Sequence, residues 1–186
     1  GYLKEKFSEL KKDYPNITIV ENPYFDIANN ISSLYAVRDH LEEAIILDGD
    51  QLIFNSDILH PEFTRSGYAC IPVENGTDEW LMQVNADGVV TSCSRTGGEK
   101  GWQLYSISRW TKEDGEKLKH HLEIEFEEKK NHEIYWDDVA MFCYPTEYEM
   151  GIYPMQQGDI VEIDSLEELV TMDASYQTLL EEGHYE

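Results

Sequence analysis

Residues 44–50 read AIILDGD, an apolar run that ends in two carboxylates on either side of a glycine. A short apolar run of this kind is typical of a strand that is buried on both faces. Upstream lie an alternating, β-branched segment at 16–21 (NITIVE) and a helical pattern over 31–41, which Asn29 and Asn30 can cap. Strand, helix and strand joined by short connections predict a βαβ unit, and therefore a parallel sheet in an α/β domain.

The rest of the chain alternates between strand and helix patterns, without repeats or long linkers. An amphipathic helix is expected over 2–14, and a long helix over 111–130 with Thr111 as its cap. Further expected elements are strands at 67–73, 79–84, 89–94, 102–109, 152–154 and 159–163, a short helix over 137–144, and a final helix that Ser165 opens. We therefore expect one domain over residues 1–186.

The composition of the chain excludes several classes of protein. Its 186 residues include 38 Asp and Glu against 14 Lys and Arg, which gives a formal net charge of −24. A surface this negative repels phosphate groups, which argues against nucleic acids and anionic membranes as partners. Disorder is excluded because 41% of the residues are hydrophobic and 12% are aromatic. No apolar run approaches the roughly 18 residues of a membrane span, and the first residues are unlike a signal peptide, so a cytoplasmic protein is expected.

Carboxylates are the candidate metal ligands, because the three cysteines form no CxxC pair. Asp50 follows the predicted strand at 44–47, and ligands of open parallel sheets bind beyond the carboxyl ends of the strands. A carboxylate there can hold Mg²⁺ against phosphate oxygens. On spacing alone, however, Asp48 and Asp50 are better explained as turn residues. Asp137 and Asp164 are further candidates; each could equally cap a helix, and for Asp164 the cap is the better local explanation.

Aromatic residues near acids could form a pocket for a cation; they are Trp80, Trp102, Trp110, Tyr135 and Trp136. Each aromatic face attracts a quaternary ammonium group by about 0.5–2 kcal/mol, and the neighbouring acids Asp78, Glu79 and Asp137 would add Coulomb attraction. Ordinary core packing explains most aromatic residues in any protein, and it is the alternative here. The residues alone thus indicate an acidic α/β domain with a candidate metal and cation site.

Several short motifs occur in one order along the chain: GYLKE at 1–5, NNISSLY at 29–35, LDGD at 47–50, TDEW at 77–80, SISRW at 106–110, YWD at 135–137 and EIDS at 162–165. In this order they resemble the CTP:phosphocholine cytidylyltransferases of the LicC type, which share the nucleotidyltransferase fold of the sugar-phosphate nucleotidylyltransferases. The similarity runs from Gly1 to about Leu180. Any one motif is a weak signal, and their shared order makes the resemblance specific.

The resemblance implies a three-layer α/β/α sandwich around a mixed, mostly parallel sheet. It implies an enzyme of choline metabolism that transfers CMP from CTP to phosphocholine, giving CDP-choline and pyrophosphate. In this family pattern Asp50 would be the catalytic Mg²⁺ ligand and Asp137 the second catalytic acid at the metal. Asp164 would be a weaker metal candidate.

The resemblance also implies how the substrates are held. Trp80 and Tyr135 would belong to an aromatic box around the trimethylammonium group. Asn30 and Ser33 lie where the family contacts nucleotide or substrate. Phosphoethanolamine, 2-aminoethylphosphonate or a sugar phosphate are the alternative acceptors, although an amine or a sugar would need hydrogen-bond partners rather than bare aromatic faces.

The chain departs from the family at its beginning. The family starts with a strand and a glycine-rich loop that carries an Arg and is followed by a Lys, and this unit wraps the triphosphate. Here the chain opens at residues that follow that unit, so we expect an N-terminally truncated domain without the first βαβ unit. Such a fragment would bind CTP abnormally and could be inactive alone. A non-catalytic choline-phosphate-binding module is the alternative from another class, and other domains could be fused to the full-length protein.

Overall fold

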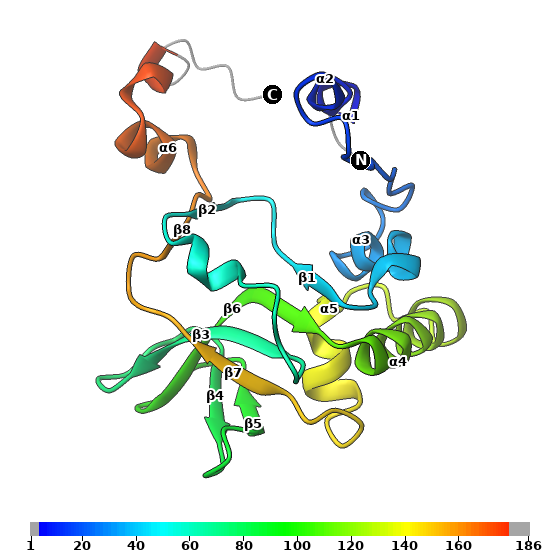
Figure 1. Cartoon of the computed structure of the whole chain (residues 1–186), viewed down its shortest axis with the longest axis vertical. Helices are drawn as coiled ribbons and strands as arrows, with labels where there is room; N and C mark the ends of the chain where they lie inside the picture. Colours follow the sequence, from blue (N-terminus) through cyan, green and yellow to red (C-terminus); the bar gives the residue numbers. More distant parts are fainter. Residues whose placement is uncertain (1–3, 179–186) are drawn as a thin grey trace.

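The computed structural model describes residues 4–178, and in this range a six-stranded sheet forms the centre of the molecule (Figure 1). Its strands are β1 (Ala44–Ile46), β3 (Gly67–Val73), β4 (Leu81–Val84), β5 (Val90–Ser94), β6 (Gly101–Trp110) and β7 (Gly151–Pro154). The strand order is β5-β4-β6-β3-β7, and β1 also pairs with β6. β6 therefore organises the sheet, because β1, β3 and β4 all pair with it.

The sheet is mixed, as predicted, with one correction to its strand directions. Among the described pairs only β3 and β7 run parallel, whereas β6 is antiparallel to each of its partners and β4 is antiparallel to β5. The expected parallel majority is therefore wrong for this range. A parallel pair needs a crossover of a dozen or more residues, and the short turn between β4 and β5 leaves no room for one.

The predicted strand at 16–21 does not form in the structure. Its apolar side chains Ile17, Ile19 and Val20 are exposed, and no ladder joins this segment to another described strand. Alternating β-branched residues favour extended backbone, but a strand also needs a neighbour to complete its hydrogen bonds. The predicted βαβ unit is therefore not present in the described range.

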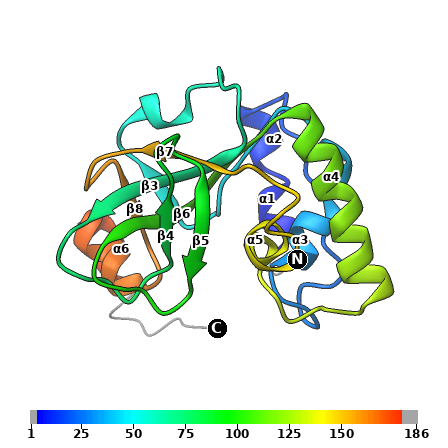
Figure 2. The ribbon, with the colours of Figure 1, turned by 90° about the horizontal axis from the view of Figure 1, so that it is seen from below.

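Helices cover one face of the sheet (Figure 2). They are α3 (Ile31–Ala36), α4 (Lys112–Glu123) with the π-helical turn η3 (Ile124–Glu128), and α5 (Trp136–Asp138) with the π-helical turn η4 (Val139–Cys143). The predicted cap of the long helix is confirmed, because the Thr111 side chain accepts a hydrogen bond from the Asp114 N–H. The helix predicted over 2–14 is instead two short ones, α1 (Lys4–Phe7) and α2 (Leu10–Asp13), and residues 1–3 lie outside the described range.

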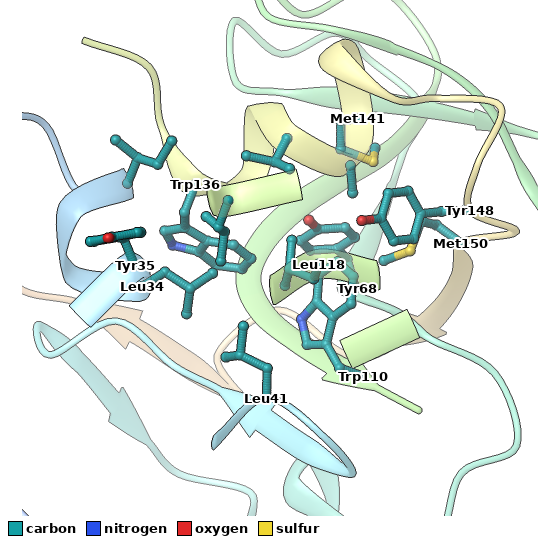
Figure 3. Packing of buried hydrophobic residues seen from close by; sticks show 14 of the residues in the cluster. Leu34, Tyr35, Leu41, Tyr68, Trp110, Leu118, Trp136, Met141, Tyr148 and Met150 are labelled. Carbon is teal, nitrogen blue, oxygen red and sulfur yellow. The ribbon is translucent and has the colours of Figure 1, made fainter. Parts of the chain in front are cut away.

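The main core lies between these helices and the sheet (Figure 3). Tyr68 of β3 and Trp136 of α5 stack with ring centroids 6.2 Å apart, and both are buried. Leu118 of α4 and Trp110 of β6 are fully buried in the same cluster. Each buried side chain of this size contributes about 1.5–3 kcal/mol by leaving water, so this packing fixes α5 against the sheet.

The opposite face of the sheet carries a smaller core, formed by Ile58, Ala69, Ile71, Ile107, Met155 and Ile160. It is covered by the short helix η2 (Ser56–Leu59) and by a separate antiparallel pair, β2 (Gln51–Ile53) with β8 (Ile160–Glu162). The remaining helices are η1 (Arg38–His40), α6 (Leu166–Met172) and η5 (Ala174–Tyr176). None of the helices between residues 4 and 178 is long and apolar enough to span a membrane.

Candidate active site

Segments that are distant in sequence meet at a pocket of about 240 Å³, which we call the acidic pocket. They include the loop after β1, strand β6, the approach to β4, the start of α5 and the end of β8. The residues that line it are Asn30, Asp48, Glu79, Trp80, Leu104, Ser106, Tyr135, Asp137 and Glu162. Four of them carry carboxylates, so the pocket is suited to cations.

Asp137 is a buried acid of this pocket, with 5% of its surface exposed. Its Oδ2 accepts a hydrogen bond from Ser106 Oγ at 3.5 Å, and its Oδ1 is buried without a hydrogen-bond partner among residues 4–178. Burial, and then the charge of Asp48, raises the pKa of Asp137 well above its ordinary value. A cation bound at Oδ1 would compensate the cost of keeping this carboxylate ionised.

Asp48 lines the same pocket, close enough for its charge to raise the pKa of Asp137. Burial raises the pKa of Asp48; a hydrogen bond with Ser106 opposes that shift, and the charge of Asp50 adds to it. In the described part of the chain, no three His, Cys, Asp or Glu side chains are grouped so that they could hold a metal by themselves. Mg²⁺ commonly binds one or two carboxylates together with substrate phosphates and water. Asp48 and Asp137 therefore fit a magnesium ion that substrate phosphates help to hold.

The other predicted metal ligands, Asp50 and Asp164, do not line the acidic pocket. Asp50 lies in the turn before β2, where its carbonyl accepts a hydrogen bond from the Ile163 N–H at 2.9 Å. Asp164 donates its backbone N–H to Glu168 Oε2 at 2.8 Å, beside the capping box that opens α6. The metal roles of Asp50, Asp137 and Asp164 stay predictions, and of these residues Asp137 alone lines the pocket.

Trp80 and Tyr135 line the pocket with rings at right angles, which we call the aromatic corner. Their ring centroids are 6.1 Å apart and their planes meet at 87°. The Tyr135 side chain is half exposed, and Glu79 lies beside Trp80 in the same lining. Two rings with a carboxylate nearby can attract a cationic group. The other predicted aromatics belong to core packing, in or against the main core: Trp102, Trp110 and Trp136.

An ion pair between the half-exposed Arg95 and the buried Asp138 positions the aromatic corner. Asp138 accepts hydrogen bonds at Oδ1 from Arg95 Nε, at 3.0 Å, and from Arg95 Nη2. Its Oδ2 accepts the Tyr135 backbone N–H at 2.9 Å. The Arg95 guanidinium lies 3.6 Å from the ring centroid of Phe142, whose ring packs edge-on against Trp80 at 5.3 Å. Both rings of the corner are therefore held by the same Arg95–Asp138 pair.

The two polar residues predicted to contact substrate have different positions. Asn30 lines the pocket, and its Oδ1 accepts the Trp136 backbone N–H at 2.9 Å, which ties the start of α3 to the start of α5. Ser33 is exposed outside the pocket, where its Oγ accepts a hydrogen bond from Asn22 Nδ2 at 3.2 Å. The structure thus brings Asn30, and not Ser33, to the acidic pocket.

Sequence reasoning missed part of this site. Asp48 was explained as a turn residue, although the apolar strand before it is the same signal that singles out Asp50. Ser106 begins the SISRW motif, from which no role was predicted for it. It lines the pocket because alternate residues of β6 face that side. Glu162 reaches the pocket through the pairing of β8 with β2, in which it lies opposite Gln51. That long-range pairing leaves no local trace in the sequence.

Comparison with known proteins finds relatives that are named as cytidylyltransferases. The 2-aminoethylphosphonate cytidylyltransferase of Lancefieldella rimae is 31% identical over 182 residues, which cover 97% of this chain and 73% of that protein. The chain belongs to this cytidylyltransferase family. The choline-phosphate cytidylyltransferase of Streptococcus pneumoniae, another relative, is 27% identical over 168 residues, covering 90% of this chain and 72% of that protein.

Solved structures give the same family and fold. The CTP:phosphocholine cytidylyltransferase of Streptococcus pneumoniae (LicC) superimposes with a TM-score of 0.82 at 26% identity, covering 94% of this chain and 75% of that one. The inositol-1-phosphate CTP transferase of T. maritima, at 14% identity and a TM-score of 0.65, shares the fold. No family model matches the chain. The predicted LicC-like family, its nucleotidyltransferase fold and its enzyme class are thus confirmed.

Proposed function

We propose that this cytidylyltransferase transfers CMP from CTP to phosphocholine in a Mg²⁺-dependent reaction. The aromatic corner, next to the carboxylates of Asp48 and Asp137, is the observation that carries the proposal. A trimethylammonium group has no N–H to donate, so ring faces and nearby negative charge suit it better than hydrogen-bond acceptors do. The choline-phosphate relative in Streptococcus pneumoniae supports this acceptor.

The proposed reaction needs positioning more than proton transfer. An oxygen of the acceptor phosphate attacks the α-phosphorus of CTP, and the bond from that phosphorus to pyrophosphate breaks. The attacking oxygen is already anionic, so no general base is required. Trp80 and Tyr135 would hold the cationic end of the acceptor, while Asp48 and Asp137 would hold the metal. Mg²⁺, when bound, supplies neutralisation of the phosphate charges.

2-Aminoethylphosphonate is the second candidate acceptor, because the relative in Lancefieldella rimae carries that name at 31% identity. Its primary ammonium group donates hydrogen bonds and would need acceptors. Glu79 and Glu162 in the lining of the acidic pocket can supply them. Sequence similarity thus favours this acceptor, and the aromatic corner favours phosphocholine.

Pyrophosphate release from CTP and Mg²⁺, measured with the full-length protein, distinguishes the acceptors directly. We expect kcat/KM for phosphocholine to exceed that for 2-aminoethylphosphonate and for phosphoethanolamine by at least about tenfold, roughly 1.4 kcal/mol of discrimination. A tenfold preference for 2-aminoethylphosphonate would reject phosphocholine as the acceptor and leave the second candidate. Reactions without acceptor and with EDTA in place of Mg²⁺ are the controls.

A further inference from the structure

A second pocket, of about 520 Å³, lies on the other face of the sheet, and we call it the Arg109 pocket. Arg109 and Ile107 alternate along β6 with Ser106 and Ser108, so they point to the face opposite the acidic pocket. The two pockets share no lining residue. A ligand of the Arg109 pocket would therefore occupy a place distinct from the proposed acceptor site.

The pocket contains a buried positive charge with an unused hydrogen-bond donor. Arg109 is only 4% exposed, and its guanidinium lies 4.1 Å from the ring centroid of Tyr153. Its Nη2 donates to the Ile58 carbonyl, whereas its Nη1 is buried without a hydrogen-bond partner among the described residues. Burial lowers the pKa of Arg109, and the neighbouring Tyr153 opposes that shift. A buried guanidinium N–H without an acceptor is costly, so a ligand that brings an acceptor oxygen would be favoured.

Three carboxylates in the lining restrict which ligand can enter. Asp57, Glu62 and Asp159 line the pocket together with Arg109, and the first two are exposed. One cation against three acids gives a negative entrance, which repels a dianion such as phosphate more strongly than a singly charged carboxylate. The same acids attract an ammonium group. The lining is therefore complementary to a molecule that carries both charges.

We infer that the Arg109 pocket binds a small amino-carboxylate, a molecule with one carboxylate and one ammonium group. The carboxylate accepts the free N–H of Arg109 Nη1. The ammonium group lies toward the carboxylates of Asp57, Glu62 and Asp159. Such a site is separate from the acceptor site, because it lies on the other face of the sheet.

Nuclear magnetic resonance titration of the ¹⁵N-labelled chain tests this inference. The probes are glycine and 4-aminobutyrate as amino-carboxylates, acetate and inorganic phosphate as anions, and methylamine as a cation. We expect at least one amino-carboxylate to shift the amide signals of Ile58, Ala69 and Tyr153, with a dissociation constant at least about tenfold below those of acetate and methylamine. Absence of these shifts, or equally tight binding of acetate, phosphate or methylamine, would overturn the inference.

Two variants locate the charges that select the ligand. Arg109→Met should abolish the titration, provided that its circular dichroism shows a folded protein; wild-type binding in the folded variant contradicts the inference. Glu62→Gln changes an exposed side chain and should weaken amino-carboxylate binding about threefold or more, without weakening acetate binding. Glu128→Gln makes the same charge change outside the pocket and should bind as wild type. If Arg109→Met does not fold, equal binding by Glu62→Gln and Glu128→Gln rejects the inference.

Discussion

At the scale of single residues, Asp138 connects the stability of the fold to the geometry of the candidate site. It is 3% exposed and accepts hydrogen bonds from Arg95 and from the backbone of Tyr135. Arg95 in turn stacks on Phe142, which packs against Trp80. Removing this carboxylate would release both rings of the aromatic corner together.

Asp138→Ala should destabilise the protein and weaken acceptor binding. The variant loses the charge-assisted hydrogen bonds from the half-exposed Arg95 and the hydrogen bond from the Tyr135 N–H, so we expect a loss of about 2 kcal/mol in the free energy of unfolding. Urea unfolding measures this loss, and calorimetric titration with phosphocholine measures the acceptor affinity. Asp26→Ala, an exposed control, should change neither quantity. Unchanged acceptor affinity in a folded Asp138→Ala protein would show that the ion pair does not position the corner.

Asp137→Asn should weaken divalent-metal binding at least about tenfold, because a neutral amide is a poorer ligand than a carboxylate. Mn²⁺ can replace Mg²⁺ as a paramagnetic probe, so electron paramagnetic resonance reports the free metal directly. Asp48→Asn should behave like Asp137→Asn, since both side chains line the acidic pocket. Asp26→Asn, a change at an exposed position, should bind Mn²⁺ as wild type. Wild-type Mn²⁺ binding by Asp137→Asn would contradict the assignment.

The sequence allowed some of these residues to be predicted and not others. Asp137 stood out because it follows an aromatic pair within a recognised motif order. The Arg95–Asp138 pair could not be predicted, because 43 residues separate its partners and neither lies in a charge pattern. Long-range ion pairs depend on how the elements pack, which local spacing does not encode.

At the scale of elements, the sequence predicted best those features that depend on residues close together in the chain, such as helix caps. The strand predicted at 67–73 coincides with β3, and the helix predicted over 111–130 appears as α4 and η3 behind the predicted Thr111 cap. The final helix also opens at Ser165 as predicted, and the structure adds a capping box with Glu168. By contrast, 16–21 has the residue pattern of a strand but no pairing partner in the described range. Strand pairing is a non-local event, so residue pattern alone does not decide it.

The contact between α4 and the 144–148 loop should make stability depend on pH through His121. Its ring stacks on Tyr144 with centroids 3.7 Å apart, and Nδ1 is 2.7 Å from the Tyr148 hydroxyl. Burial, and then the charge of His120, lowers the pKa of His121 below 6.5. The folded state therefore prefers the neutral ring, and its stability is present above pH 6.5 and lost as pH falls through the lower folded pKa.

His121→Phe keeps a stacked ring and removes this titration. Urea unfolding midpoints at about pH 7.5 and about pH 5 should therefore differ less in the variant than in the wild type. His121→Gln removes both ring and titration, and should also show the smaller difference while being less stable at both pH values. A full wild-type pH difference in His121→Phe would show that another group controls acid sensitivity.

At the scale of the whole molecule, the acidic residues that give the net charge of −24 fall into two groups. A few acids, Asp48, Glu79, Asp137 and Glu162, gather at the acidic pocket, where a metal and a cationic acceptor would compensate them. The larger part of the excess lies on exposed positions, where like charges repel across the surface. A single domain over 1–186 and a cytoplasmic location stay predictions at this scale.

Surface repulsion predicts that salt stabilises the protein. Raising NaCl from about 20 mM to about 500 mM shortens the Debye length from roughly 20 Å to roughly 4 Å, which screens the repulsion. The melting temperature should therefore increase over this range. An uncharged solute of equal osmolality is the control, because it changes water activity without screening. A melting temperature that falls with salt would show that attractive ion pairs outweigh the net repulsion.

The binding of phosphocholine by the aromatic corner tests the central claim most directly. Isothermal titration with phosphocholine compares the wild-type chain with the Trp80→Ala/Tyr135→Ala protein, and Tyr14→Ala serves as an exposed aromatic control. Loss of two cation–π contacts of about 0.5–2 kcal/mol each predicts a dissociation constant at least about fivefold higher in the double variant. Unchanged affinity in the folded double variant would contradict the proposed acceptor site.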